Sequence, residues 1–255
     1  MFSVLRKMNW TSHRVVSAVS AVGLPLVLYN MALPQPIFRF LVPVFVLLVL
    51  AIELLTWRTL KSLNEARVWA VVRSSLFYLS WGLLFFLMPS PFLQGLYIFS
   101  SIPILYIGQQ LVAYTGETVL ITHTILTSFG IIMGVVASEF YFHASGLMMS
   151  SVLFLVYFLL TRATYIFVPQ TSVVRLVASI LVALCAVEAY IAILYLPFHY
   201  TVVGFLTFLS FYLIWLFTYY WQFGVLTFAR VKFYLLISLL FGVGILLATP
   251  WQVVP

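Results

Sequence analysis

Nine runs of mostly apolar residues follow one another along the chain, separated by short polar or proline-containing turns. A helix needs about 20 apolar residues to cross the hydrocarbon core of a bilayer. The runs occupy residues 15–33, 37–57, 68–88, 96–115, 119–142, 147–167, 175–196, 201–221 and 231–249. The sequence therefore predicts an all-α, polytopic transmembrane helical bundle of about nine spans, or eight if the first run does not fully cross. Gly23 and Pro25 interrupt that first run.

Composition supports lipid as the solvent of this chain. The 255 residues are 65% hydrophobic and only 7% charged, whereas soluble domains carry about 25% charged residues. The longest polar connection, from Arg58 to Arg67, has room for little more than a turn. We therefore expect a single transmembrane helical domain over residues 15–255. Residues 1–14 are expected to form a cytoplasmic tail rather than a cleavable signal, because polar residues interrupt the region where such a signal is apolar.

The distribution of basic residues predicts the orientation. Of the 12 Lys and Arg residues, all but Arg39 fall on one side if the nine runs alternate across the membrane. Basic residues accumulate on the cytoplasmic side of membrane proteins, so the N-terminus is predicted to lie inside. The inner residues are Arg6, Lys7, Arg14, Arg58, Lys61, Arg67, Arg73, Arg162, Arg175, Arg230 and Lys232. The expected location is the plasma membrane of a bacterium or archaeon.

Several functional classes are not expected. The basic residues form no patch, so the net charge of +7 does not indicate nucleic-acid binding. Cys185 is the single cysteine, which excludes an intrachain disulfide or a thiolate metal site. The sequence has no nucleophile elbow, no glycine-rich phosphate loop and no strong metal motif. We expect no cofactor, and the expected partners are membrane lipids and, as an open alternative, other membrane subunits.

Ionisable residues inside the runs need an explanation because each costs about 2.5–3.5 kcal/mol at the middle of a span. Glu53, Arg73, Glu117, His123 and Arg162 all fall near the predicted inner ends. Charge pairing that fixes helix orientation is the favoured interpretation of this inner layer. The alternative is one gate or coordination layer of a permeation path.

The run at 119–142 is the most polar of the nine. His123, Thr127, Gly130, Gly134 and Ser138 share one sector of a helical wheel, and the spacing of Gly130, Gly134 and Ser138 is typical of a close helix contact. The opposite sector holds Glu117, Thr124, Ser128, Glu139 and His143. A helix with two such faces is expected at the centre of the bundle rather than against lipid.

Three residues near the predicted outer side form a second candidate group. Glu139 and His143 are four residues apart, and His199 lies in a turn on the same side. Two histidines and a carboxylate can hold a metal or act as acid and base. The spacing matches no established motif, and interfacial side chains with pairing between a glutamate and Arg39 are the favoured explanation.

Glu188 is the best single functional candidate. It lies about eight residues, or about 12 Å, from the outer end of its run, and no charge lies within one turn. Such a residue must be protonated, paired with another helix or exposed to water. Because Cys185, Ala189 and Ala192 flank it, its face is expected to be packed. A proton-coupling site and a structural hydrogen bond across the bundle are both open.

Gln109 and Gln110, with Tyr106 and Tyr114, give the fourth run a polar inner half. Hydrogen bonding between helices is the expected role of these side chains, and contact with a substrate is the less favoured alternative.

Three functions remain open. The first is a permease-like or accessory membrane component that handles a small or lipidic molecule, with Glu188, Glu117, Thr124, Ser128 and Glu139 along its path. The second, equally favoured, is a non-enzymatic subunit of a larger membrane complex. The third and least favoured is an intramembrane enzyme that uses Glu139, His143 and His199.

Overall fold

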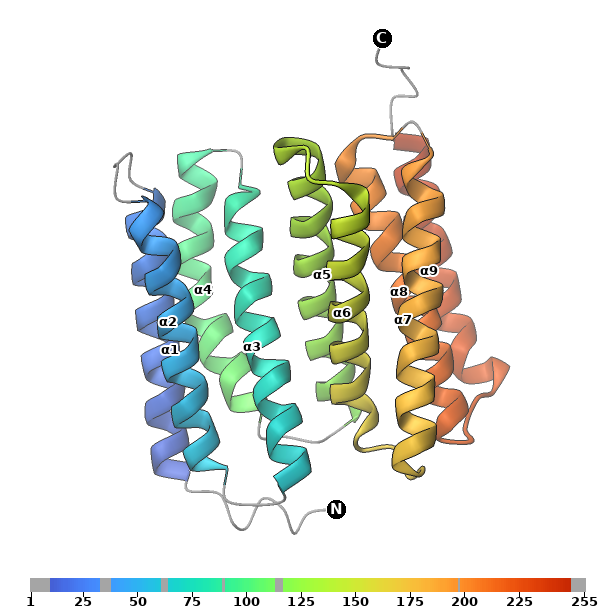
Figure 1. Ribbon diagram of the computed structural model, residues 1–255, viewed down its shortest axis with the longest axis horizontal. Helices are drawn as coiled ribbons and strands as arrows, with labels where there is room; N and C mark the ends of the chain where they lie inside the picture. The colour runs from blue at the N-terminus through green and yellow to red at the C-terminus, as the bar shows by residue number, and fades with distance from the viewer. Residues whose placement is uncertain are drawn as a thin grey trace. The chain divides into compact units, whose positions relative to one another are not determined.

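Nine helices form the part of the chain that the computed structural model describes, which covers residues 10–32, 38–60, 64–88, 90–112, 117–196 and 198–248. Figure 1 shows them as long, roughly antiparallel rods within each part of the chain. Their bounds are α1 (Trp10–Ala32), α2 (Phe38–Thr59), α3 (Asn64–Phe86), α4 (Pro91–Val112), α5 (Glu117–Phe142), α6 (Gly146–Tyr165), α7 (Ser172–Leu194), α8 (Tyr200–Gln222) and α9 (Phe228–Ala248).

The predicted transmembrane helical bundle is confirmed. Eight helices, α1 to α8, are long and apolar enough to cross a membrane. The interrupted first run is one of them, because α1 continues through Pro25 and offers an apolar span from Ser12 to Met31. The last helix, α9, has a shorter apolar stretch, Val231–Leu247. The helix that falls short of a full apolar span is therefore the last one and not the first.

The chain divides into two compact units, Met1–Thr127 and Ser128–Pro255. The expectation of a single domain over residues 15–255 stays a prediction. In unit 1, α1 packs against α2 and α4, and α3 packs against the same two helices. The buried apolar side chains between them include Leu24, Leu28, Ile52, Phe77 and Leu105. Unit 1 is thus a four-helix arrangement with an apolar core of its own.

In unit 2, α7 packs against α6 and α8, and α9 packs against α8. Aromatic stacking contributes to this core: the Tyr157 ring of α6 stacks on the Phe211 ring of α8 with centroids 4.5 Å apart. Trp215 of α8 is fully buried and donates from Nε1 to Thr164 Oγ1 of α6. These contacts fix α6 and α8 side by side, with α7 covering both.

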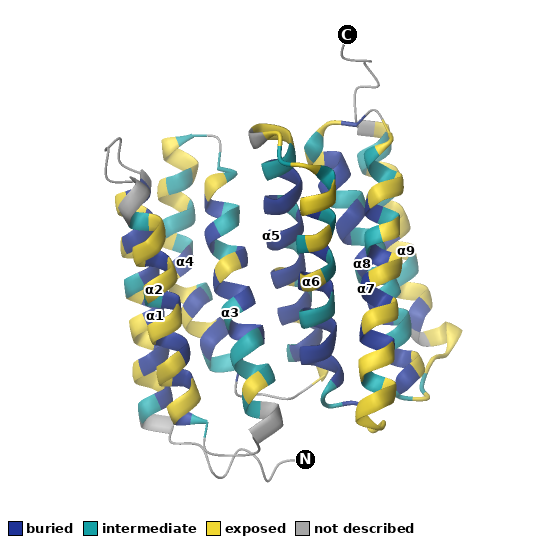
Figure 2. Ribbon diagram, in the orientation of Figure 1, coloured by how far each residue is buried: buried dark blue, intermediate teal, exposed yellow. Residues whose placement is uncertain are grey.

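The helix α5 contributes to both units, because the boundary between them falls at Thr127 and Ser128. Buried residues make up 61% of an apolar 18-residue window of its span, the largest share among the eight, and only 17% of the corresponding window of α4. Figure 2 shows the contrast as a mostly dark-blue α5 beside helices with long yellow faces. In unit 1, the His123 ring lies 4.8 Å from the Phe77 ring of α3. In unit 2, Phe129 packs edge-on against Phe208 of α8.

Candidate functional site

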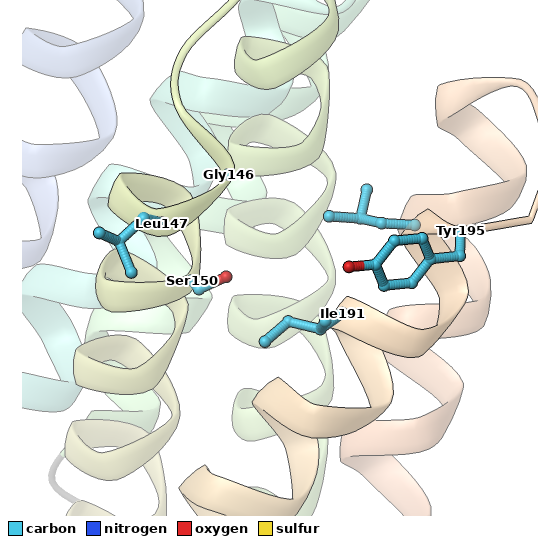
Figure 3. Close-up of a pocket in the computed structure, with 6 residues that line it drawn as sticks. Gly146, Leu147, Ser150, Ile191 and Tyr195 are labelled. Atoms are coloured by element: carbon cyan, nitrogen blue, oxygen red, sulfur yellow. The ribbon is translucent and has the colours of Figure 1, made fainter.

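A cleft opens between the first turns of α6 and the last turns of α7 in unit 2 (Figure 3). Its volume is about 410 Å³. The lining residues are Gly146, Leu147, Ser150, Ile191, Leu194 and Tyr195. The cleft lies at the end of unit 2 that holds the α5–α6 and α7–α8 turns, which is the predicted outer end. It is mainly apolar, and its polar groups come from α6 and from Tyr195.

The polar groups of the cleft are available for a ligand. The Ser150 and Tyr195 hydroxyls both point into the space between the helices (Figure 3), and neither has a hydrogen-bond partner among the described residues. Ser145 caps α6 by accepting from the Met148 N–H. The first N–H groups of a helix have no intrahelical partner and carry partial positive charge. The cleft thus combines apolar walls, two hydroxyls and a helix N-terminus.

A carboxylate lies directly behind the cleft wall. Tyr190 Oη of α7 donates a hydrogen bond to Glu139 Oε2 of α5. The other carboxylate oxygen, Oε1, would lie 3.3 Å from a Cβ built on Gly146. Glycine at this position therefore gives Glu139 room against the start of α6. The sequence singled out Glu139, but it missed Tyr190 and Gly146.

The other residues predicted to line a path lie in different surroundings. Glu188 is exposed on the surface of α7, so the expectation that its face is packed is wrong for this unit. Glu117, at the start of α5, is also exposed. Thr124 and Ser128 are each 1% exposed, and Thr124 donates to the Leu120 carbonyl of its own helix. The structure groups none of these four with the cleft residues.

Glu139, His143 and His199 do not form a metal site, because no three His, Cys, Asp or Glu side chains of the described residues are placed to hold a metal ion. His199 instead caps α8, and its Nδ1 lies 2.9 Å from Thr201 Oγ1. His143 is exposed, in a left-handed conformation with φ of 50°. The proposed pairing of a glutamate with Arg39 lies outside the described residues, since the Arg39 side chain is not among them.

A second polar cluster, buried in unit 1, centres on the Gln109 amide of α4. Gln109 Oε1 accepts from Tyr78 Oη at 2.5 Å and from Ser74 Oγ at 3.0 Å, both on α3. Gln109 Nε2 donates to Thr56 Oγ1 of α2 at 2.7 Å. The Gln109 backbone carbonyl accepts from His13 Nε2 of α1 at 3.0 Å. One residue therefore joins all four helices of unit 1.

Two buried ionisable groups flank this cluster. Glu53 Oε1 of α2 lies 2.6 Å from Ser74 Oγ, so Glu53 and Gln109 Oε1 share the single proton of that hydroxyl. Arg73 of α3 donates from Nη2 to the Val112 carbonyl, at the C-terminal end of α4, where the helix dipole favours a cation. Glu53 Oε2 and Arg73 Nε and Nη1 have no hydrogen-bond partner among the described residues. Both side chains thus keep unused hydrogen-bonding capacity, which buried water commonly fills in such places.

Of the inner layer predicted from the sequence, Glu53 and Arg73 lie at this hydrogen-bonded network in unit 1, whereas Glu117 is exposed and Arg162 belongs to unit 2. Glu53, Arg73 and the glutamine pair were identified from the sequence, and Gln110 does bond between helices, donating to Ser17 Oγ at 2.9 Å. Thr56 and Ser74 were missed. Serine and threonine are common at helix contacts in membranes, so their presence alone did not distinguish them.

Comparisons of this chain with models of protein families, with characterised proteins and with solved structures find no match. The fold supports a polytopic helical membrane architecture, and it does not by itself imply a function.

Proposed function

We propose that this chain is a permease-like or accessory membrane component that handles a lipidic molecule, which binds in the cleft between α6 and α7. The observation that carries the proposal is the cleft itself, with apolar walls and two hydroxyls that have no partner in the described part of the chain, at one end of unit 2. Its volume of about 410 Å³ is within the range of small-molecule sites, about 300–1,000 Å³.

The chemistry of the cleft fits a phospholipid with a zwitterionic head group. The N–H groups at the start of α6 and the Ser150 and Tyr195 hydroxyls suit a phosphodiester. Glu139, behind Gly146, offers a negative charge for the ammonium group. The exposed Leu147 and Ile191 side chains suit the acyl chains. Of the five residues predicted to line a path, Glu139 alone takes part in this proposal.

Photolabelling tests the proposal. The purified protein is reconstituted into vesicles that contain a zwitterionic phospholipid with a photoactivatable acyl chain, and labelled peptides are mapped. We expect labelling at the facing ends of α6 and α7. Ser150→Trp fills the cleft and should abolish this labelling. The matched control is Ser151→Trp, because Ser151 is the exposed neighbour on α6 outside the cleft lining. Labelling that is equal in the two variants would refute the proposal.

A second function, a subunit of a larger membrane complex, is favoured by a different observation. Glu188 is exposed within the span of α7 and has no partner among the described residues. The enzyme alternative has no comparable support, since the three residues invoked for it do not form a cluster of metal ligands in the described structure.

A further inference from the structure

We infer that the face of α7 around Glu188 docks a transmembrane helix of another polypeptide, and that this helix carries a lysine or arginine at the depth of Glu188. The inference rests on the second of the two functions, a subunit of a larger complex, and the face that it uses shares Ile191 with the lining of the lipid cleft. It identifies the surface and the chemistry of the partner.

Glu188 lies well inside the span of α7, on an exposed and otherwise apolar face. Glu188 lies six residues before Leu194, the last residue of α7, which places it about 9 Å inside the helix end at 1.5 Å per residue. The residues around it on the same face are exposed and apolar, among them Leu181, Leu184 and Ile191. A carboxylate facing lipid costs about 2.5–3.5 kcal/mol at the middle of a span, and less toward its end, unless a partner compensates for it.

The described basic side chains of unit 2 all lie far from Glu188. The basic side chains that the structure describes in unit 2 are Arg162 near the end of α6, Arg175 in the first turn of α7 and Lys232 near the start of α9. All three lie toward the opposite end of the unit from Glu188, because neighbouring helices run antiparallel. None of them can reach Glu188 from within unit 2.

The same distribution argues against a second copy as the occupant. Copies of one chain share an orientation in the membrane, so a symmetric contact through this face would bring Glu188 against Glu188. Two like charges would then meet in a medium of low dielectric constant, which is unfavourable. A different polypeptide with a basic residue at this depth supplies the complementary charge.

The shape of the face permits close approach of a helix. Cys185 and Ala192 are exposed and Ala189 is half-buried, and these small side chains form one flank of Glu188. Small residues at a contact let two helix backbones approach closely in a membrane. A basic side chain on the incoming helix can then reach the carboxylate across a short gap.

The single cysteine of the chain makes a direct test possible, because Cys185 lies one turn before Glu188 on the exposed face. The full-length protein is reconstituted into phosphatidylcholine vesicles with a synthetic leucine-rich transmembrane peptide. The peptide carries one lysine in its span and one cysteine three residues before it. A matched peptide has leucine in place of the lysine. Disulfide formation under mild oxidation is measured as the yield of the protein–peptide adduct on gels.

We expect about tenfold more adduct with the lysine peptide than with the leucine peptide, a ratio that corresponds to about 1.4 kcal/mol. Glu188→Gln should reduce the yield of the lysine peptide to that of the leucine peptide. Leu239→Gln, which places a glutamine at an exposed position of α9 outside the α7 face, should leave the preference intact. The comparison of the two peptides uses the unaltered protein, so it holds even if a variant fails to fold.

Two results would overturn the inference. Equal yields with the lysine and leucine peptides would show that charge does not select the occupant. Efficient Cys185–Cys185 linkage between two protein chains, with or without peptide, would identify a second copy as the occupant instead. Ser150→Trp, which fills the lipid cleft, should leave peptide cross-linking unchanged, so failure of the lipid proposal is distinguishable from failure of this one.

Discussion

At the scale of single residues, the glutamine at position 109 illustrates how polar groups are tolerated inside this membrane protein. Its side chain offers an acceptor oxygen and a donor amide, and both are used, by Ser74 and Tyr78 on one side and Thr56 on the other. Lipid cannot satisfy these groups, so they must be satisfied by neighbouring helices. Gln109 is therefore a determinant of how the helices of unit 1 assemble.

We predict that Gln109→Leu destabilises the protein by about 2 kcal/mol, since it removes three side-chain hydrogen bonds that average about 0.6 kcal/mol each in membrane proteins. Gln110→Leu is the matched control. It removes one such bond, to Ser17, and should cost about 0.6 kcal/mol. The free energy of unfolding in mixed micelles measures both, and equal losses would show that Gln109 is not the centre of the network.

The exposure of individual residues was the hardest property to predict. The sequence predicts a packed face for Glu188, which is exposed, and it does not distinguish Ser74 and Thr56, which are buried. In a soluble protein, an apolar stripe indicates the inner face of a helix. Here both the core and the lipid are apolar, so the polarity of a residue does not tell which way it faces. Gln109 could be predicted to form a hydrogen bond between helices, because an amide inside a span requires a partner.

At the scale of elements, close helix contacts in unit 1 depend on glycines that face aromatic rings. A Cβ built on Gly108 of α4 would lie 2.6 Å from Cε1 of Phe77 on α3. The Phe77 ring is 2% exposed, and it is also held by contacts with Tyr78, Trp81 and the His123 ring. It has little freedom to move aside, so Gly108 sets the distance between α3 and α4.

We predict that Gly108→Ala destabilises the protein by about 1–3 kcal/mol, the usual cost of overpacking a core. Gly95→Ala, in the same helix, is the control. A Cβ at Gly95 meets nothing within 4 Å, so alanine should leave stability unchanged or raise it by up to about 1 kcal/mol through its helix propensity. Thermal unfolding of the two variants under the same conditions measures the difference. A loss of the same size in both would assign the effect to the loss of glycine and not to the ring contact.

The existence and order of the helices were predictable from the sequence, because runs of about 20 apolar residues are a direct consequence of bilayer thickness. The ends of the helices were predicted less accurately. For example, α4 begins at Pro91, five residues before its predicted start, because proline is well tolerated at the first position of a helix. The cleft could not be predicted. It requires the first turns of α6 and the last turns of α7 to lie opposite each other, and that pairing is a property of unit 2 as a whole.

At the scale of the whole molecule, the alternating directions of the helices bring the basic residues of each unit to one end. In unit 1, Arg14 lies near the start of α1, Arg58 near the end of α2, and Arg67 and Arg73 in the first half of α3. Antiparallel neighbours bring these positions to the same end of the unit. The same end-to-end pattern holds separately in unit 2. The sequence did not reveal the division at Thr127 and Ser128, because it falls inside the apolar run at 119–142.

The positive-inside rule therefore predicts that the α6–α7 turn lies in the cytoplasm and the α7–α8 turn outside. Two single-cysteine variants, made in a Cys185→Ser background, test this in intact cells with a membrane-impermeant maleimide. Leu196→Cys, exposed in the outer turn, should react at once. Gln170→Cys, exposed in the inner turn, should react only after the membrane is opened. The reverse pattern would invert the orientation and place the lipid cleft, which lies at the Leu196 end of unit 2, in the cytoplasmic leaflet. The proposed lipid would then bind from that leaflet. The pairing of Glu188 with a basic residue would be unaffected, since it depends on depth within α7 and not on orientation.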